Sequence, residues 1–161
     1  MDSLWSQLTT ALAEEFSDIT DVSDLVRITV RLSVAAVLGA LLGIEREAKG
    51  KAAGVRTHML VAVSCALFVL IPQMSGTANA DMTRVIQGVI AGIGFLGAGA
   101  IIKGRDDESV RGLTTAAGIF MTAAIGIAAG LGREATALLS TILALAIFSI
   151  APVIVNWFEK K

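Results

Sequence analysis

The side chains that could do chemistry are concentrated in short polar stretches between long apolar runs. The densest stretch, GIEREAKGKAAGVRTHM, places six charged side chains between two such runs. Its acids Glu45 and Glu47 are two residues apart, so on a continuous helix they point about 200° apart and cannot form one clamp. Glu45 can pair with Lys49 one turn later, or with Arg56 or His58 across the loop. We therefore expect a functional site at the two ends of this stretch rather than along it.

A second polar group stands at the start of the third apolar run. Asp81 can cap the free N–H groups of a helix there, where the helix dipole favours a negative charge. Arg84 is within its reach three residues later. An ion-entry site is the alternative use of this group. Gln87, one turn deeper, has no capping role and is therefore the residue that favours an ion-entry site more. Arg31 is the most deeply placed charge of the first run, and it either extends its side chain outward or pairs with an acid such as Asp81.

Two threonines, Thr114 and Thr115, open the fourth apolar run. Their hydroxyls either bond back to the helix or line a polar pocket. The full set of candidate binding residues shares a position at the edges of the apolar runs: Glu45, Arg46, Glu47, Arg56, Thr57, His58, Asp81, Arg84, Gln87, Thr114 and Thr115.

Mg²⁺ is the cation that such oxygen-bearing side chains would suit, because it takes hard oxygen ligands in octahedral geometry and keeps several waters. The candidate metal ligands are Glu45 and Asp81. A single chain offers no acid in the middle of an apolar run. A complete ion path would therefore need an oligomer that brings copies of Glu45 or of Asp81 together.

The residue types and their spacing do not indicate catalysis or nucleic-acid binding. The one histidine, His58, has no metal-ligand pair or nucleophile–base constellation beside it. The segment GIGFLGAG matches Gly-x-Gly-x-x-Gly, but it lies inside an apolar run without the strand–turn–helix context of a dinucleotide site. A net charge of -1 offers no basic face for nucleic acid. We expect neither an enzyme nor a nucleic-acid-binding protein.

The elements that must position these residues are membrane spans. The 161-residue chain is 55% hydrophobic and 17% charged, with a mean hydropathy of +0.76, whereas ordinary soluble domains carry about 25% charged residues. Spans of about 20 apolar residues cross a bilayer as helices. The sequence therefore predicts an all-α, polytopic bundle of five transmembrane helices, roughly at 25–44, 56–75, 84–103, 112–131 and 134–156.

Lysines and arginines predict the direction of the spans. Nine of them lie in the first loop, the third loop and the tail, against three near the span ends on the other side. Because cytoplasmic loops carry the excess of positive charge, we expect the N-terminus outside and the C-terminus in the cytoplasm.

The N-terminal stretch predicts a separate amphipathic helix. Leu4, Trp5, Leu8, Leu12 and Phe16 recur at helical spacing among acidic and hydroxyl residues. A helix with this pattern lies in the membrane–water interface, here on the outer side. The predicted organisation is thus an interfacial helix over 1–20, one transmembrane domain over 25–156 and a cytoplasmic tail over 157–161.

Small residues predict how the helices pack, since apolar lipid supplies no hydrophobic drive between them. The third span carries glycines on two opposite faces, which predicts that it lies at the centre of the bundle, unless GIGFLGAGAI unwinds locally to expose carbonyls to an ion. The same faces suggest self-association as a homodimer. The expected packing glycines are Gly39, Gly43, Gly88, Gly92, Gly94, Gly97, Gly99, Gly118 and Gly126.

A weak internal repeat relates the first two spans to the next two. A shift of 58 residues aligns Leu38-Gly39-Ala40 with Leu96-Gly97-Ala98 and, without a gap, Gly54 and Thr57 with Gly112 and Thr115. A parallel duplication predicts two hairpins in the same orientation. The abundance of glycine and alanine in membrane helices is the alternative explanation.

Three ordered segments carry a family resemblance: GIEREAKGKAAGVRTHMLV, RVIQGVIAGIGFLGAGAIIK and VRGLTTAAGIFMTAAIGIAAGLG. Together they resemble the membrane domain of the MgtC/SapB family over about residues 25–132. The best-known members carry a cytoplasmic C-terminal domain, which this chain does not include, and some have a Trp where this chain has Phe120. The family's motif residues correspond here to Glu45, Arg46, Glu47, Gly54, Arg56, Thr57, His58, Asp81, Arg84, Gly92, Gly94, Phe95, Gly97, Gly99, Gly112, Thr114 and Thr115.

The resemblance implies a bacterial inner-membrane protein tied to magnesium limitation. Family members are often regarded as magnesium transporters, and in pathogens they support intracellular survival and are thought to restrain the membrane ATP synthase. Two hypotheses follow for this chain. One is Mg²⁺ binding or transport; the other is a non-transporting regulator that docks on another membrane complex such as the ATP synthase.

Overall fold

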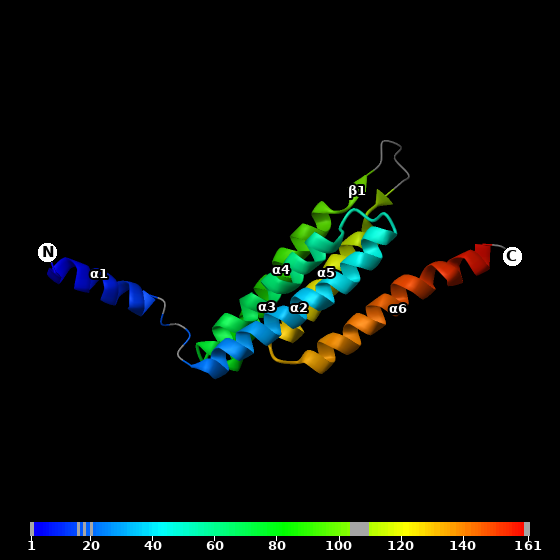
Figure 1. Ribbon diagram of the computed structural model, residues 1–161. Coiled ribbons are helices and arrows are strands. Elements are labelled where there is room, and N and C mark those ends of the chain that lie inside the picture. Colours follow the sequence, from blue (N-terminus) through cyan, green and yellow to red (C-terminus); the bar gives the residue numbers. More distant parts are fainter. Residues whose placement is uncertain (1, 16, 18, 20, 104–109, 160–161) are drawn as a thin grey trace. The chain divides into compact units, whose positions relative to one another are not determined.

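The computed structural model describes residues 2–15, 17, 19, 21–103 and 110–159. The chain divides into two units, Met1–Val30 and Arg31–Lys161. The described residues form six helices and a short antiparallel pair of strands (Figure 1). The elements are α1 Asp2–Glu15, α2 Val22–Ala48, α3 Val55–Met74, α4 Asn79–Gly99, β1 Ile102–Lys103, β2 Val110–Arg111, α5 Leu113–Gly130 and α6 Glu134–Glu159.

The first unit contains α1 and the beginning of α2. The predicted N-terminal helix is present as α1, whose Leu4, Trp5 and Leu12 side chains are exposed, while Phe16 lies outside the described residues. Asp21 immediately precedes α2, and the Asp24 N–H donates to its Oδ1 at 2.8 Å, as at a helix N-cap. A hydrogen bond from the Ser23 hydroxyl, together with that backbone bond, holds the pKa of Asp21 below its usual value.

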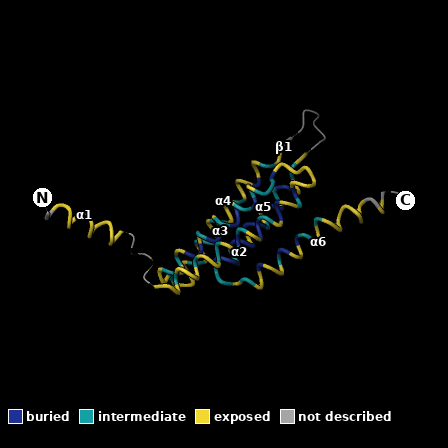
Figure 2. Tube along the Cα trace, in the orientation of Figure 1, coloured by how far each residue is buried: buried dark blue, intermediate teal, exposed yellow. Residues whose placement is uncertain are grey.

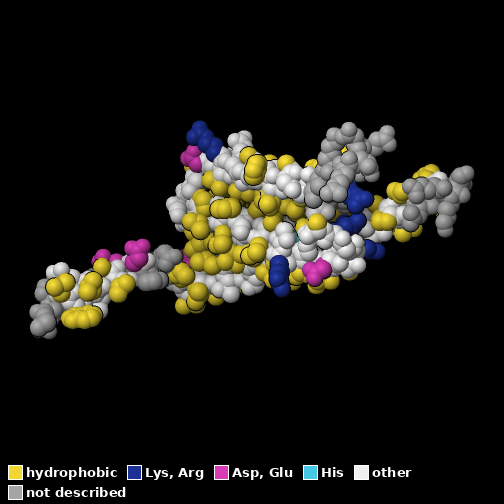
Figure 3. Space-filling model, turned by 90° about the horizontal axis from the view of Figure 1, so that it is seen from above, with side chains coloured by type: hydrophobic (Ala, Val, Ile, Leu, Met, Phe, Trp, Pro, Cys, Tyr) yellow, Lys and Arg dark blue, Asp and Glu magenta, His cyan; other side chains and the backbone are white. Residues whose placement is uncertain are grey.

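The predicted bundle of membrane-spanning helices is confirmed. Five helices, α2 to α6, are long and apolar enough to cross a membrane. In the second unit, hydrophobic side chains cover much of the face seen in Figure 3, and several Lys and Arg side chains gather at one end. Such a surface suits a lipid surrounding, because the apolar face needs no second layer of protein to cover it.

Two helices, α3 and α5, form the centre of the bundle. A Cβ added at Gly126 or Gly130 of α5 would collide with the backbone carbonyl of Ala62 or Ala66 on α3. Only glycine permits this approach, so the small residues spaced by four along α5 are used for contact with α3. Buried residues concentrate in these two helices and in the adjoining part of α2 (Figure 2).

From Arg31 onward, α2 packs closely on α3. A Cβ at Gly39 would lie 2.7 Å from the His58 carbonyl oxygen, and one at Gly43 would lie 2.5 Å from the Val55 α-carbon. The two backbones are therefore in direct contact along this line. Leu42, which is fully buried, fills the adjoining core with alanines and Ile125.

The prediction that the third span lies at the centre is wrong. In the candidate span α4, 11% of the most apolar window is buried, against 50% in α5. Cβ atoms added at Gly88, Gly92, Gly94 and Gly99 would meet nothing within 4 Å. Glycine faces permit close approach of any helix, including one from another chain, and sequence spacing does not say which. The alternative of local unwinding is not seen either, because α4 is a continuous helix from Asn79 to Gly99.

The structure is consistent with the 58-residue repeat. Gly54 and Gly112, which the shift aligns, are the N-cap residues of α3 and α5. Gly39 faces His58 between α2 and α3, and the aligned Gly97 faces the aligned Ala116 between α4 and α5. Each hairpin thus places its first helix against the second at the same position.

The last helix, α6, packs against α5 and is otherwise largely exposed. It contributes Ala137, Thr141 and Ala144 to the buried interior. The Thr141 hydroxyl donates to the carbonyl of Ala137 on the same helix, so it needs no partner from another element.

Candidate functional site: a buried polar cluster at one end of the bundle

A buried charge marks the end of the bundle where α2 leads into α3. The Arg46 side chain is 4% exposed, and its guanidinium donates to Glu45 Oε2. The Arg46 guanidinium carbon also lies 3.8 Å from the centroid of the Phe148 ring on α6, a cation–π arrangement. The last turn of α2 therefore holds an ion pair under an aromatic cover, and the expected pair between Glu45 and Lys49 is not among the described ion pairs.

A second buried polar contact joins α3 to α5. His58 is fully buried, and its Nδ1 lies 2.6 Å from Thr122 Oγ1. The Thr122 hydroxyl also lies 2.9 Å from the Gly118 carbonyl. Its one hydrogen therefore goes either to that carbonyl or to His58 Nδ1, and the tautomer of the imidazole decides which.

Gly118 brings these two contacts together. A Cβ at Gly118 would lie 3.3 Å from Phe148 Cζ and 3.6 Å from His58 Cε1. The absence of a side chain there lets the aromatic ring and the imidazole approach the same point of α5. We call Glu45, Arg46, His58, Gly118, Thr122 and Phe148 the Arg46–His58 cluster.

Two buried polar atoms of the cluster have no partner. Among the described residues, Glu45 Oε1 and His58 Nε2 are buried atoms without a hydrogen-bond partner. An unsatisfied buried polar group costs about 1–3 kcal/mol, and such groups usually have a structural or functional explanation. The cluster can thus accept hydrogen bonds from a donor, but the buried guanidinium already compensates the Glu45 carboxylate.

The remaining predicted residues of this end serve the loop itself. Glu47 Oε2 accepts a hydrogen bond of 2.9 Å from the Val55 N–H and so satisfies one free donor at the start of α3. Arg56 is exposed and Thr57 is partly exposed. Glu45 is not paired with Arg56 or His58 among the described ion pairs, so the expected cross-loop pairing is wrong; its partner is the adjacent Arg46.

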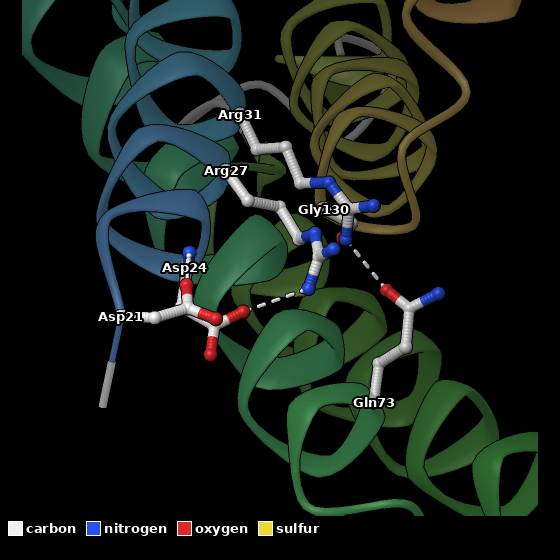
Figure 4. Close-up of polar contacts among 6 residues, drawn as sticks. All are labelled: Asp21, Asp24, Arg27, Arg31, Gln73 and Gly130. Carbon is white, nitrogen blue, oxygen red and sulfur yellow. Dashed lines mark hydrogen bonds and ion pairs between the residues drawn. The ribbon is translucent and has the colours of Figure 1, made fainter. Parts of the chain in front are cut away.

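At the opposite end, Arg31 closes the bundle from within the second unit (Figure 4). Its Nη1 donates to the Gly130 carbonyl at 2.9 Å and to Gln73 Oε1 at 2.7 Å. A cation at the C-terminus of α5 is favoured by the helix dipole. Gly132, at φ 75°, leaves room for the guanidinium, because a Cβ there would collide with it. The expected pairing of Arg31 with Asp81 is therefore wrong, because the free carbonyls at the end of α5 supply the nearer acceptor.

Asp81 and Arg84 pair with each other at 3.5 Å, with exposed side chains. The expected capping by Asp81 is not seen: α4 begins after Ala78 without a side-chain capping bond. Gln87 is exposed. Asp81 and Glu45 lie on the first turn of α4 and the last turn of α2, at opposite ends of the bundle, so one chain does not bring them together.

Thr114 and Thr115 line a recess of about 520 Å³ with Lys51 and Arg111. Among the described residues, neither of these two hydroxyls donates a hydrogen bond to a backbone carbonyl of α5, although the hydroxyls of Thr122 and Thr141 do lie within hydrogen-bond distance of carbonyls of their own helices. No group of three or more His, Cys, Asp or Glu side chains that could hold a metal occurs in the described part of the chain.

Sequence reasoning missed three members of the Arg46–His58 cluster as site residues. Gly118 is among the expected packing glycines, whereas Thr122 and Phe148 are not among the candidate residues, and Phe148 lies among many apolar residues. Thr122 had one signal that could have drawn attention to it: it is the polar member of a four-residue spacing of glycines. Phe148 carried no signal, because its partner Arg46 is distant in sequence.

The fold and the polar ends define a multi-pass helical membrane protein. The model of the MgtC family matches residues 32–157. The chain therefore belongs to the MgtC family.

Individual relatives extend the comparison. The chain is similar to protein MgtC of Salmonella typhimurium, with 44% identity over 72% of this chain and 48% of the relative. It is also similar to protein SrpB of Synechococcus elongatus, with 41% identity over 73% of this chain and 71% of the relative. An uncharacterised protein of Haemophilus influenzae is 37% identical over 81% of this chain and 58% of that protein. The chain thus spans about half the length of the MgtC relative, and no solved structure matches it.

Proposed function

We propose that the chain serves magnesium homeostasis in the bacterial inner membrane, with its N-terminus outside, and that it acts on another membrane complex instead of conducting Mg²⁺ through its own bundle. The resemblance to MgtC proteins supports the link to magnesium. The excess of Lys and Arg at one side supports the orientation.

The closed interior is the observation that carries this proposal. Between Arg31 at one end and His58 at the other, the two buried clusters consist of Ala, Leu, Val, Ile and Cys side chains. Mg²⁺ gives up its waters reluctantly and needs oxygen ligands in their place. A close-packed apolar core supplies none, and the buried hydroxyls of Thr122 and Thr141 are already engaged in hydrogen bonds.

The complex proposed as its target is the ATP synthase, as the family resemblance suggests. Helix-to-helix docking requires an exposed span, and α4 and α6 both present one to the bilayer. Docking of this kind regulates a partner without any path for an ion through the regulator.

Flux measurements test the proposal. Purified full-length protein in proteoliposomes should show no Mg²⁺ flux above empty liposomes, and Glu45→Ala and Asp81→Ala should not differ from the wild type. Co-purification of ATP synthase subunits from cells that express a tagged chain should be reproducible. Mg²⁺ flux by the wild type that both variants reduce would overturn the proposal in favour of transport.

Transport by an oligomer is the second candidate, and the exposed position of Asp81 favours it. The Asp81 side chain is 59% exposed on the first turn of α4. Self-association through α4 would bring two copies of this carboxylate to one side of the membrane, where a hydrated Mg²⁺ could bind between them.

We also propose a homodimer formed through α4. Gln87, Ala91, Gly94 and Ala98 are all exposed and are spaced by four, three and four residues. This is the a/d spacing of a helix pair, and small residues on it permit close approach in lipid. A parallel two-fold axis would bring Gln87 beside its copy, where each amide can donate and accept.

Disulfide crosslinking tests the dimer in a Cys65→Ala background. Ala91→Cys should crosslink in native membranes, whereas Ala151→Cys, an equally small and exposed position on α6, should not. Monomers alone for both variants would contradict the proposed dimer.

A further inference from the structure

We propose that the recess between the α2–α3 loop and the first turn of α5 binds a phosphate group. Its volume is about 520 Å³. Its lining includes Lys51, Ala100, Arg111, Gly112 and Thr115. This site goes beyond the proposed regulatory function and does not depend on it.

The beginning of α5 supplies free backbone donors to the recess. Gly112 is the N-cap of this 18-residue helix and makes no side-chain capping bond. The first backbone bond of the helix runs from Ala116 N–H to the Gly112 carbonyl. The N–H groups of Leu113, Thr114 and Thr115 therefore have no acceptor among the described residues. Free N–H groups and the positive end of the helix dipole together form an anion site.

The hydroxyl of a buried residue, open to the recess, points independently to a ligand. Thr115 is only 5% exposed, yet its side chain makes no hydrogen bond to any described residue. It lines the recess, so the space in front of its hydroxyl belongs to the site. A phosphate oxygen there would accept the hydrogen that the hydroxyl now leaves unused.

The charged side chains among the described lining residues of the recess are basic. Lys51 and Arg111 line it, and no acid is among its described lining residues. The nearest acids of the loop are already engaged, because Glu45 pairs with Arg46 and Glu47 accepts from the Val55 N–H. Two cations and a hydroxyl beside free N–H groups suit a phosphate ester better than a metal ion.

Gly112 fixes the first turn of α5 against the end of α4. Its φ is 93°, a conformation that side-chain-bearing residues rarely adopt, and a Cβ there would collide with the Ala100 carbonyl. Ala100 and Gly112 both line the recess, so this close backbone approach forms one of its walls. The donors are thus positioned before any ligand arrives.

Two sources could supply this chemistry, a phospholipid headgroup and free phosphate, and the experiment separates them. In one arm, inorganic phosphate is titrated into full-length protein in an uncharged detergent, and binding is measured by calorimetry. In the other arm, native mass spectrometry counts phosphatidylglycerol molecules retained by the same protein. Each arm includes Lys51→Gln/Arg111→Gln and Thr115→Val, with Lys49→Gln as the control for a loop charge that does not line the recess and Thr141→Val as the control for a buried hydroxyl.

The expected result is saturable binding in at least one arm, weakened about tenfold or more in Lys51→Gln/Arg111→Gln and by a smaller factor in Thr115→Val. Both control variants should bind as the wild type does. Binding in the calorimetric arm identifies free phosphate as a ligand, and retention in the second arm identifies a lipid headgroup. Binding in neither arm, or binding that the recess variants leave unchanged, would overturn the proposal.

Discussion

The two outer helices that flank the central pair, α2 from Arg31 onward and α4, are related by the 58-residue repeat but differ in how they are held. At the aligned positions, a Cβ on Gly39 would lie 2.7 Å from a backbone oxygen, whereas one on Gly97 would lie 3.7 Å from the Ala116 side chain. Arg31 anchors α2 at its outer end, and the aligned residue of α4 is Val89. Helix α2 is fixed to the bundle by polar contacts and backbone contact, whereas a Cβ at four of the five glycines of α4 would meet nothing within 4 Å.

This difference separates two uses of glycine in membrane helices. Where a glycine of α2 or α5 contacts a neighbouring backbone, it is required by the fold of the single chain. Where a glycine of α4 meets nothing, the fold does not require it, and a surface available to a second chain is its remaining use. Substitutions on the two helices should therefore give opposite results.

The largest effect is expected from Arg46→Met, which removes the charge that holds the end of α2. Glu45, 14% exposed at its side chain, would lose its partner, and breaking a buried pair costs about 3–5 kcal/mol. The free energy of unfolding in detergent, measured with a chemical denaturant, reports the loss.

The control for Arg46→Met is Arg27→Met, whose ion pair with Asp24 involves a half-exposed side chain and should contribute no more than about 1 kcal/mol. The double variant Glu45→Gln/Arg46→Met should recover part of the loss, because the unpaired charge is gone. Equal stability of Arg46→Met and Arg27→Met would show that α2 is not held by this pair.

The next effect is expected from Gly39→Ala. A single methyl group would lie 2.7 Å from the His58 carbonyl oxygen and 3.0 Å from the Ala62 Cβ. Helices α2 and α3 must then separate, at a cost of about 1–3 kcal/mol for an overpacked contact. The same unfolding measurement applies, and a variant as stable as the wild type would mean that the two backbones are not in contact at this position.

A smaller loss is expected from Arg31→Met, which keeps the apolar stem of the side chain and removes its donors. The Gly130 carbonyl and Gln73 would lose hydrogen bonds to a charged group. Because the first bond is only partly buried and the second is exposed, water replaces the lost donors and the net loss is about 1 kcal/mol. Hydrogen exchange at the C-terminal turn of α5 should increase in this variant. Gln73→Ala is the milder comparison, because the bond to Gly130 remains; equal exchange in both variants would assign the effect to Gln73 alone.

Composition and periodicity predicted the helical elements because a bilayer demands long apolar segments, and α2 to α6 follow those segments. They could not rank the helices by burial, since lipid and protein interiors are equally apolar and glycine spacing indicates a contact without naming the partner. The ends of the 43–59 stretch were identified as polar sites from Glu45 and His58. The identities of their partners, Arg46, Thr122 and Phe148, depended on how α5 and α6 return to the same end, which no local pattern encodes.

The smallest effect, and the sharpest comparison, is expected from Gly97→Ala, the repeat counterpart of Gly39→Ala. Its methyl group would be in ordinary van der Waals contact with Ala116, 3.7 Å away, and alanine favours a helix over glycine by up to about 1 kcal/mol. The free energy of unfolding should therefore stay unchanged or rise slightly, while Gly39→Ala lowers it. A loss equal to that of Gly39→Ala would show that α4 is held as closely as α2. In that case contact with a second chain would not explain the exposed face of α4, because the glycines of both hairpins would already be needed for contacts within a single chain.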